Sequence, residues 1–240
     1  MRHAELVARL DASAERLTTR VLAEMYADRF WHARFGERAD RHGRQDGRFH
    51  VDYVIQALQA DDVGIIEHYA RWLQQVLTSR GMCTRHLAEN FARLADAIRD
   101  EAWPDGDAAI AMLDAARAAL TYPAGPARDV QHAEPALAVA ATRAVAAAGP
   151  ADGAAEPTRD LVEIVDHAAD AIALGRPDGF ARHAVWLAGF LASRGVPRAQ
   201  LVAQLEALAA AAPAILPGLA AGELATTIAT ALTALAAASG

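Results

Sequence analysis

Hydrophobic positions recur at helical spacing along most of the chain. From Ala4 to Tyr26, apolar residues return at intervals close to 3.6 residues, which is the pattern of an amphipathic helix. The same periodicity predicts further helices over residues 49–58, 62–80, 84–99 and 107–120. No stretch of useful length alternates as a strand does. We therefore predict an all-α protein of about ten helices.

Polar residues and glycines predict where these helices begin and end. Asp61, Asp62 and Thr84 are residue types that favour helix N-caps. Gly81 follows a long periodic run, so we expect it to end its helix in a left-handed conformation. The segment 28–48 is rich in Arg, His and Gly, and we expect it to be irregular or only briefly helical.

One segment of the chain occurs twice. Residues 69–81 read YARWLQQVLTSRG and residues 183–195 read HAVWLAGFLASRG, an offset of 114 residues. The same offset aligns Trp72 with Trp186, Ser79-Arg80-Gly81 with Ser193-Arg194-Gly195, Asp52 with Asp166, and Leu87 with Leu201. The register continues without a gap through a helix, a turn and a helix. The same packing is therefore expected twice, with Gly195 ending its helix as Gly81 does.

The offset predicts a pseudo-twofold tandem duplication with two helical repeats, residues 1–122 and 123–240. We place the boundary in the proline- and glycine-containing stretch 122–135. A second loose stretch is expected at 147–157. Two copies are too few for a solenoid array, so each half is expected to form its own helical bundle.

Residues near the repeated helix follow a similar order of residue types to one seen in a known protein family. In the first half these are Tyr53, Ala57, Leu58 and Asp61 or Asp62, and in the second Ala171, Ile172, Gly175, Asp178 and Arg194-Gly195-Val196-Pro197. This order resembles the central helices of phycobiliprotein-type globins, and it implies a globin-like fold for each half. The family attaches its bilin through a cysteine. Here the matching position, ten residues before Tyr53, is Gly43, and Cys83 lies beyond the third predicted helix. A covalently bound bilin is therefore not expected.

Composition excludes several classes of protein. Among the 240 residues all 23 basic residues are arginine, and the net charge of −7 argues against a nucleic-acid binder. The single cysteine excludes a disulfide framework and a thiolate metal cluster, and it fits a cytoplasmic protein. No unbroken, strongly apolar run reaches the ~18 residues of a membrane span, and residues 1–20 lack the apolar core of a signal peptide.

The arginine-rich segment offers the main candidate site. Guanidinium groups bind carboxylates and phosphates through two hydrogen bonds, and aromatic rings stack on planar ligands. The candidate ligand-binding residues are Arg34, Arg38, Arg48, Trp31, His50, Tyr53 and Trp72. The alternative is a solvated segment whose arginines pair with Asp28, Glu37, Asp40 and Asp46. For Trp72 and Trp186 we favour packing at the pseudo-twofold interface between the halves, and a stacking wall for a flat ligand is the alternative.

Other groups of residues are weaker candidates for a metal-binding or catalytic site. Glu163, His167 and Asp170 share one helix face and His183 follows on the next helix, but neither Glu-x-x-His nor His-Glu-x-x-His occurs. No metal site and no cofactor are assigned on this basis. Nucleophile-elbow, Walker, dinucleotide-binding and Cys-x-x-Cys motifs are also missing, which argues against a standard hydrolase, kinase or dehydrogenase.

The sequence therefore favours a cytoplasmic, non-enzymatic sensory or regulatory module that binds a small, flat, anionic ligand, tetrapyrrole-like at most. The alternative is an adaptor without a ligand, whose arginine-rich segment meets an acidic partner protein. A homodimer is compatible with both, and a metal- or haem-dependent enzyme is a third class.

Overall fold

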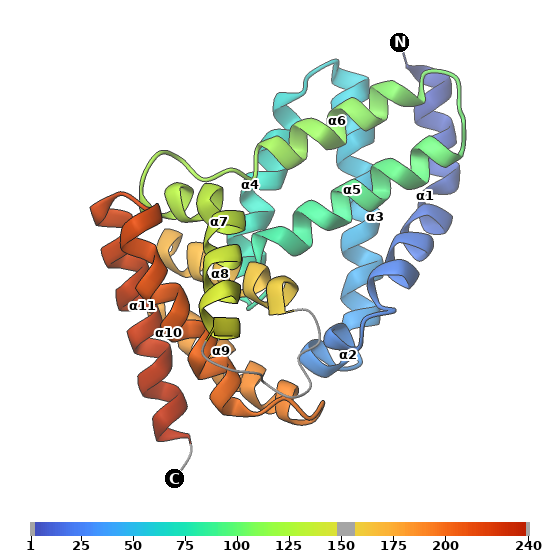
Figure 1. Ribbon diagram of the computed structural model, residues 1–240. Coiled ribbons are helices and arrows are strands. Elements are labelled where there is room, and N and C mark those ends of the chain that lie inside the picture. Colours follow the sequence, from blue (N-terminus) through green and yellow to red (C-terminus); the bar gives the residue numbers. More distant parts are fainter. Residues whose placement is uncertain (1–2, 148–156, 239–240) are drawn as a thin grey trace. The chain divides into compact units, whose positions relative to one another are not determined.

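The computed structural model describes residues 3–147 and 157–238, which form helices and no strand (Figure 1). The helices are α1 (Ala4–Met25), α2 (Arg29–Phe35), α3 (Arg38–Ala60), α4 (Gly64–Ser79), α5 (Thr84–Asp100), α6 (Gly106–Ala118), α7 (Pro126–Ala147), α8 (Pro157–Ala173), α9 (Pro177–Ala192), α10 (Arg198–Ile215) and α11 (Gly218–Ala237). The all-α expectation is confirmed. The loose stretch expected at 147–157 lies almost entirely outside the described residues.

Contacts divide the chain into two compact units. Unit 1 contains Met1–Gln75 and His86–Leu120, and unit 2 contains Val76–Arg85 and Thr121–Gly240. The end of α4 and the first two residues of α5 therefore belong to unit 2, although both helices are continuous across the division.

In unit 1, α3 packs closely against α1 through two glycines. A Cβ atom added to Gly43 would overlap the side chains of Tyr26 and Leu22, and one added to Gly47 would overlap Thr18. The expectation of an irregular segment over 28–48 is wrong, because α2 and α3 occupy nearly all of it. The glycines that suggest a loop are instead the points where two helices approach each other.

The other face of α1 is held to α5. Arg93 of α5 lies 3.1 Å from Glu24 of α1, and Arg20 and Arg16 of α1 pair with Asp100 and Glu101. Beneath these exposed pairs, apolar side chains from several helices form the core of unit 1. They include Leu10, Leu17, Val54, Phe91, Ile98 and Leu113. Burial of these side chains provides the main stabilisation, since exposed ion pairs contribute little.

Unit 2 has a core built largely of leucine and alanine. α7 packs against α8 and α10, while α11 packs against α9 and α10. The buried residues include Leu137, Leu161, Ile164, Leu201, Leu205, Leu224 and Ile228. α7 begins at Pro126 and contains Pro135, so helix occupies most of the stretch where we expected the boundary between the repeats.

Helix ends recur at the 114-residue offset. Adding 114 to the bounds of α5 gives 198–214, and α10 spans Arg198–Ile215. Adding 114 to the bounds of α4 gives 178–193, and α9 spans Pro177–Ala192. Asp61 after α3 has φ 53° and Gly175 after α8 has φ 60°, again 114 residues apart. The two segments thus share helix lengths and turn positions.

The turns after α4 and α9 also have the same hydrogen bonds. Gly81 and Gly195 have φ 92° and 81°, which confirms the left-handed conformation expected of both. The amide of Met82 donates to the carbonyl of Leu77 at 3.1 Å, and that of Val196 donates to Leu191 at 3.0 Å. Such a bond across six residues satisfies a carbonyl that the helix leaves open.

Candidate functional site

Three aromatic side chains in unit 1 form what we call the first aromatic row: Tyr53 of α3 with Tyr69 and Trp72 of α4. The rings of Tyr53 and Tyr69 stack with centroids 3.8 Å apart and planes inclined by 14°. Trp72 continues the row at 6.2 Å from Tyr69, and 52% of its surface is exposed. Tyr69, the middle ring, is buried and Tyr53 is half-buried, so the row reaches the surface of unit 1 at Trp72.

A buried hydrogen bond fixes Tyr69, the middle ring of this row. Nδ1 of His50 lies 2.8 Å from the hydroxyl oxygen of Tyr69, and the His50 ring also packs on Phe91. Burial lowers the pKa of His50 to about 3, so the imidazole is neutral at physiological pH. Burial, followed by the charge of Asp46, raises the pKa of Tyr69. The pair is therefore a neutral hydrogen bond suited to positioning rather than to proton transfer.

The arginines predicted as an anion clamp have different surroundings. Arg48 is within 2.6 Å of Asp11 and 2.8 Å of Asp52, and therefore ties α3 to α1. Arg34 is half-buried, and burial lowers the pKa of its guanidinium group. The Arg38 side chain lies outside the described part of the structure.

Three neighbouring arginines are more accessible. Arg29, Arg41 and Arg44 are exposed, and within the described residues none of them forms an ion pair. Arg41 and Arg44 are three residues apart on α3, so they lie on the same side of this helix. Their charge is therefore available to an anion, whereas that of Arg48 is already balanced.

Trp31 belongs to a separate aromatic cluster around α2. Its ring contacts those of Tyr26, Phe30, Phe35 and His86 at centroid distances of 4.9–5.9 Å, and only 6% of its surface is exposed. Trp31 thus packs in the interior of unit 1, where it offers no free face to a ligand.

The structure therefore brings together three of the seven predicted residues, His50, Tyr53 and Trp72. Tyr69, which sequence reasoning missed, links all three. Its position was available from the repeated segment, because Tyr69 opens that segment and lies one helical turn before Trp72.

Unit 2 contains a second aromatic row: His167 of α8 with His183, Trp186 and Phe190 of α9. The rings of His167 and His183 stack at 3.7 Å with planes inclined by 22°. Trp186 follows at 5.9 Å from His183, and Phe190 stacks on Trp186 at 5.2 Å. His167, His183 and Trp186 lie 114 residues after Tyr53, Tyr69 and Trp72.

Asp170 is the centre of a polar network beside this second row. One of its carboxylate oxygens accepts from the Thr84 amide at 2.8 Å. The other accepts from the Thr84 and Tyr122 hydroxyls, each at 2.6 Å. Asp170 therefore satisfies the first amide of α5, a role that the sequence assigned to Thr84 alone.

A second carboxylate lies nearby on α8. Asp166 is buried and its Oδ2 is 3.5 Å from Arg85, which also approaches Glu134 at 3.6 Å. Burial, with the charge of Glu134, raises the pKa of Asp166 to about 7. Arg85 is thus shared by two acids in unit 2.

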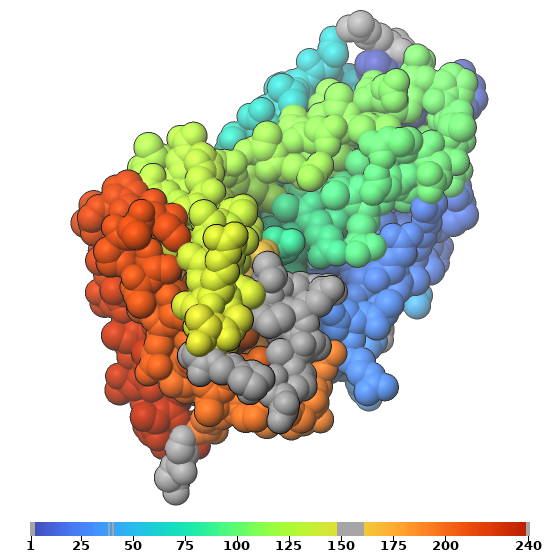
Figure 2. Space-filling view, viewed as in Figure 1, coloured from blue at the N-terminus to red at the C-terminus, as the bar shows by residue number. Residues whose placement is uncertain are grey.

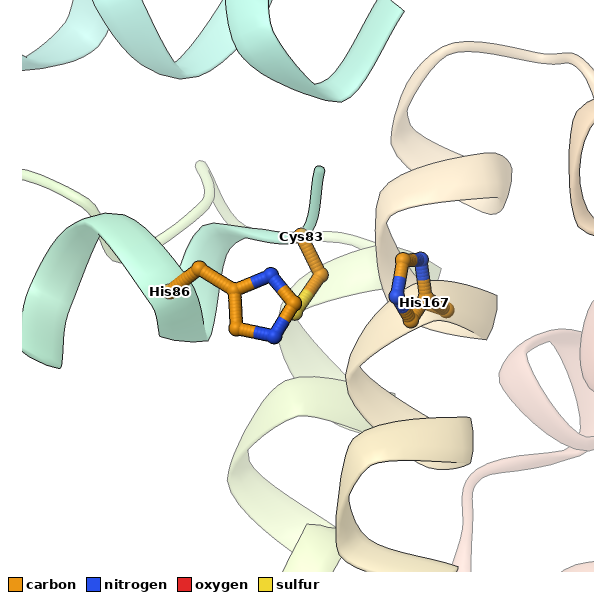
Figure 3. Close-up of side chains that lie close together, drawn as sticks. All are labelled: Cys83, His86 and His167. Carbon is orange, nitrogen blue, oxygen red and sulfur yellow. The ribbon is translucent and has the colours of Figure 1, made fainter. Parts of the chain in front are cut away.

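Cys83 and His167 meet in the same unit. Both side chains are buried, and a ring nitrogen of His167 lies within 4.8 Å of the Cys83 sulfur (Figure 3). Nε2 of His167 is 4.0 Å from Glu163 on the preceding turn of α8. A thiol and an imidazole at this separation can hydrogen-bond or can share a metal ion.

Unit 2 also has an open groove of about 860 Å³ between α9 and α11. Alanine and threonine side chains form most of its walls, and the Asp178–Arg182 ion pair lies at its edge. The three lining threonines, Thr226, Thr230 and Thr233, each donate to a carbonyl one turn earlier in α11. The groove therefore offers few polar groups that could select a ligand.

One helix among the described residues, α11, is long and apolar enough to cross a membrane by length and composition. A core helix passes the same test, and α11 buries Leu224, Ile228 and Leu235 in unit 2. Its other face lies at the surface of that unit (red in Figure 2), where Thr226 and Ala229 are exposed.

No protein-family model, no curated protein and no solved structure matches this chain.

Proposed function

We propose that the protein is a non-enzymatic sensory or regulatory module that binds a small, flat, anionic ligand at the first aromatic row. The observation that carries this proposal is the exposure of Trp72 at the end of a stacked, hydrogen-bonded row. A planar ligand stacking on Trp72 extends the row by one ring, and the His50–Tyr69 bond keeps the row rigid while it does so.

The anionic character of the ligand rests on α3. Arg41 and Arg44 are exposed and carry charges that no acid among the described residues balances. They precede Tyr53 on the same helix, and in this proposal they are assigned to the acidic groups of the ligand. In this proposal Arg48 supports the site by holding α3 to α1 and does not contact the ligand.

We further propose that the two halves of the chain are diverged copies of one globin-like helical unit. The similar helix lengths, the matching left-handed turns and the stacked pairs Tyr53–Tyr69 and His167–His183 support this interpretation. The second copy replaces the tyrosines by histidines, and its Trp186 is only half-exposed. The ligand is therefore assigned to the first copy. A cytoplasmic location stays a prediction from composition.

A second candidate function is the adaptor with an acidic protein partner. It is favoured by three large apolar side chains on α3, α4 and the turn between them: Phe49, Val63 and Trp72 are 45%, 43% and 52% exposed. A contiguous exposed apolar patch marks a partner site, and the adaptor function requires these three side chains to form one.

Binding of protoporphyrin IX, a flat dicarboxylate, tests the proposal. The absorbance of the purified full-length chain is recorded first, and the porphyrin is then titrated while tryptophan fluorescence is followed. We expect saturable quenching that Trp72→Ala weakens at least about tenfold and the matched Trp186→Ala leaves unchanged. Equal quenching in both variants, or none in the unsubstituted chain, overturns the ligand proposal. Co-purification of a stoichiometric acidic protein with a colourless chain supports the adaptor.

A further inference from the structure

Helix α11 of unit 2 exposes a face that carries no charge. From Leu224 to its end at Ala237 this helix contains no charged residue. Only 39% of the apolar 18-residue window that it contains is buried in the fold. Helix surfaces that face water in globular proteins normally carry charged and polar side chains. The exposed face of α11 is therefore an apolar surface that the chain itself leaves uncovered.

The groove between α9 and α11 has two walls with the same periodicity. On α11 the lining residues return every three or four positions and include Thr226, Ala229, Thr233 and Ala237. On α9 they follow the same interval and include Asp178, Ala181 and Val185. Helices pack side by side with this spacing, and short side chains allow their axes to approach closely. The two walls together thus resemble one half of a four-helix bundle.

A large apolar side chain continues the α11 wall beyond the groove. Leu219 lies seven residues, or about two helical turns, before Thr226, and it is therefore on the same side of α11. Its surface is 70% exposed, the highest value among the large apolar side chains in the described part of the chain. An exposed leucine in line with an uncharged helix face indicates that this surface is completed by another apolar surface.

The charges at the edge of the groove favour a second copy of the chain as the partner. The chain has a net charge of −7, so two copies repel each other over most of their surfaces. The groove instead carries one acid and one base, Asp178 and Arg182, and is neutral. Across a twofold axis each arginine can pair with the aspartate of the other copy, which makes the edge complementary to itself. A lipid surface would have to desolvate this exposed ion pair without replacing it.

We propose that two copies of the chain associate through this face, so that α9 and α11 of both copies form a four-helix bundle about a twofold axis. The α11 face of each copy packs into the groove of the other. The groove threonines already donate their hydroxyl hydrogens within α11, so they offer mainly methyl groups to the partner. The interface assigns a surface to the homodimer that the sequence allows. It uses unit 2 alone and does not depend on the ligand of the first aromatic row.

Sedimentation velocity of the full-length chain, at concentrations from about 1 μM to about 100 μM, measures the dimer directly. We expect Ala229→Arg to weaken dimerisation at least about a hundredfold, because it buries an unpaired charge in the interface. Leu219→Glu should weaken it at least about tenfold. The matched control is Ala210→Arg, at an exposed alanine of α10 outside the groove, which should leave dimerisation unchanged. Circular dichroism of each variant checks that the helices are retained.

An unsubstituted chain that stays monomeric over the whole concentration range overturns the proposal. So does a dimer that persists in both Ala229→Arg and Leu219→Glu, or one that Ala210→Arg weakens as much as Ala229→Arg. Flotation with phosphatidylcholine vesicles tests the membrane as the other occupant, and a monomer that floats with them overturns the dimer. Trp72→Ala, which tests the aromatic-row ligand, should leave the dimer intact, so the two proposals can fail separately.

Discussion

The ring of His167 stacks on that of His183 in the geometry that Tyr53 and Tyr69 adopt 114 residues earlier in the chain. The centroid distances are 3.7 and 3.8 Å, and the planes are inclined by 22° and 14°. Chemically different rings thus occupy equivalent positions on equivalent helices. Two flat groups therefore stack at positions 114 residues apart, although the rings differ in chemistry.

Burial of His50 predicts acid sensitivity. Its pKa falls from an ordinary value near 6.5 to about 3 in the folded chain, so between these values the unfolded chain binds more protons. The free energy of unfolding should therefore be highest above pH 6.5 and fall as the pH drops towards 3, by up to about 1.4 kcal/mol per pH unit. Denaturant unfolding from pH 7 to pH 4 measures this slope.

The comparison needs His50→Gln, which removes the titrating group while other groups stay common to both proteins. Between pH 4 and pH 7, the free energy of unfolding should rise more steeply with pH in the original chain than in His50→Gln. His68→Gln, at an exposed position on α4, should leave the slope of the original chain unchanged. Identical slopes for the original chain and His50→Gln would contradict the assignment.

Asp170→Ala should lower the free energy of unfolding by about 1–3 kcal/mol. The substitution leaves the buried amide and hydroxyl of Thr84 and the Tyr122 hydroxyl without their common acceptor. Asp178→Ala is the control, because its ion pair with Arg182 is exposed and should contribute well under 1 kcal/mol. Urea unfolding of the two variants gives the values, and equal losses would count against the role of Asp170 at the start of α5.

Gly47→Ala should destabilise the chain by about 1–3 kcal/mol, because the new methyl group overlaps the Thr18 side chain of α1. Gly189→Ala provides the opposite case on α9, where a Cβ atom meets nothing within 4 Å. There the higher helix propensity of alanine should stabilise the chain by about 0.5–1 kcal/mol. Thermal unfolding of both variants tests whether α1 and α3 approach as closely as the structure places them.

The double variant Arg41→Gln/Arg44→Gln should weaken protoporphyrin binding by about tenfold or more, since each guanidinium contributes charge-assisted hydrogen bonds. Added salt should weaken binding to the original chain and have less effect on the variant. Arg48→Gln should leave the affinity for protoporphyrin nearly unchanged, because Arg48 already forms ion pairs with Asp11 and Asp52. If Arg48→Gln reduces binding as strongly as the double variant, Arg48 contacts the ligand after all.

The all-α class was predictable because apolar periodicity is a local property. Gly81 and Gly195 end their helices as expected, since a glycine after a long periodic run has few other roles. Asp62 accepts the Gly64 amide at 2.8 Å just before α4, whereas Asp61 instead ends α3 in a left-handed conformation. Propensity alone does not distinguish these two neighbouring aspartates.

Residues 28–48 were misjudged because the sequence does not reveal what packs on a glycine. Gly43 and Gly47 weaken an isolated helix, but in the fold they allow α1 to approach α3. The meeting of Cys83 with His167 could not be predicted either, since 84 residues separate them and no local spacing marks the pair. Such contacts are set by the packing of α8 within unit 2, which no short motif encodes.

Because Cys83 is buried, the rate at which its thiol reacts can report local opening of this chain. It is the single thiol of the sequence, and 1% of its surface is exposed. A thiol-reactive dye can reach it only when the turn between α4 and α5 opens, so the labelling rate reports the free energy of that opening. When opening and closing are fast compared with labelling, the rate follows the open population, and no engineered probe is needed to read it.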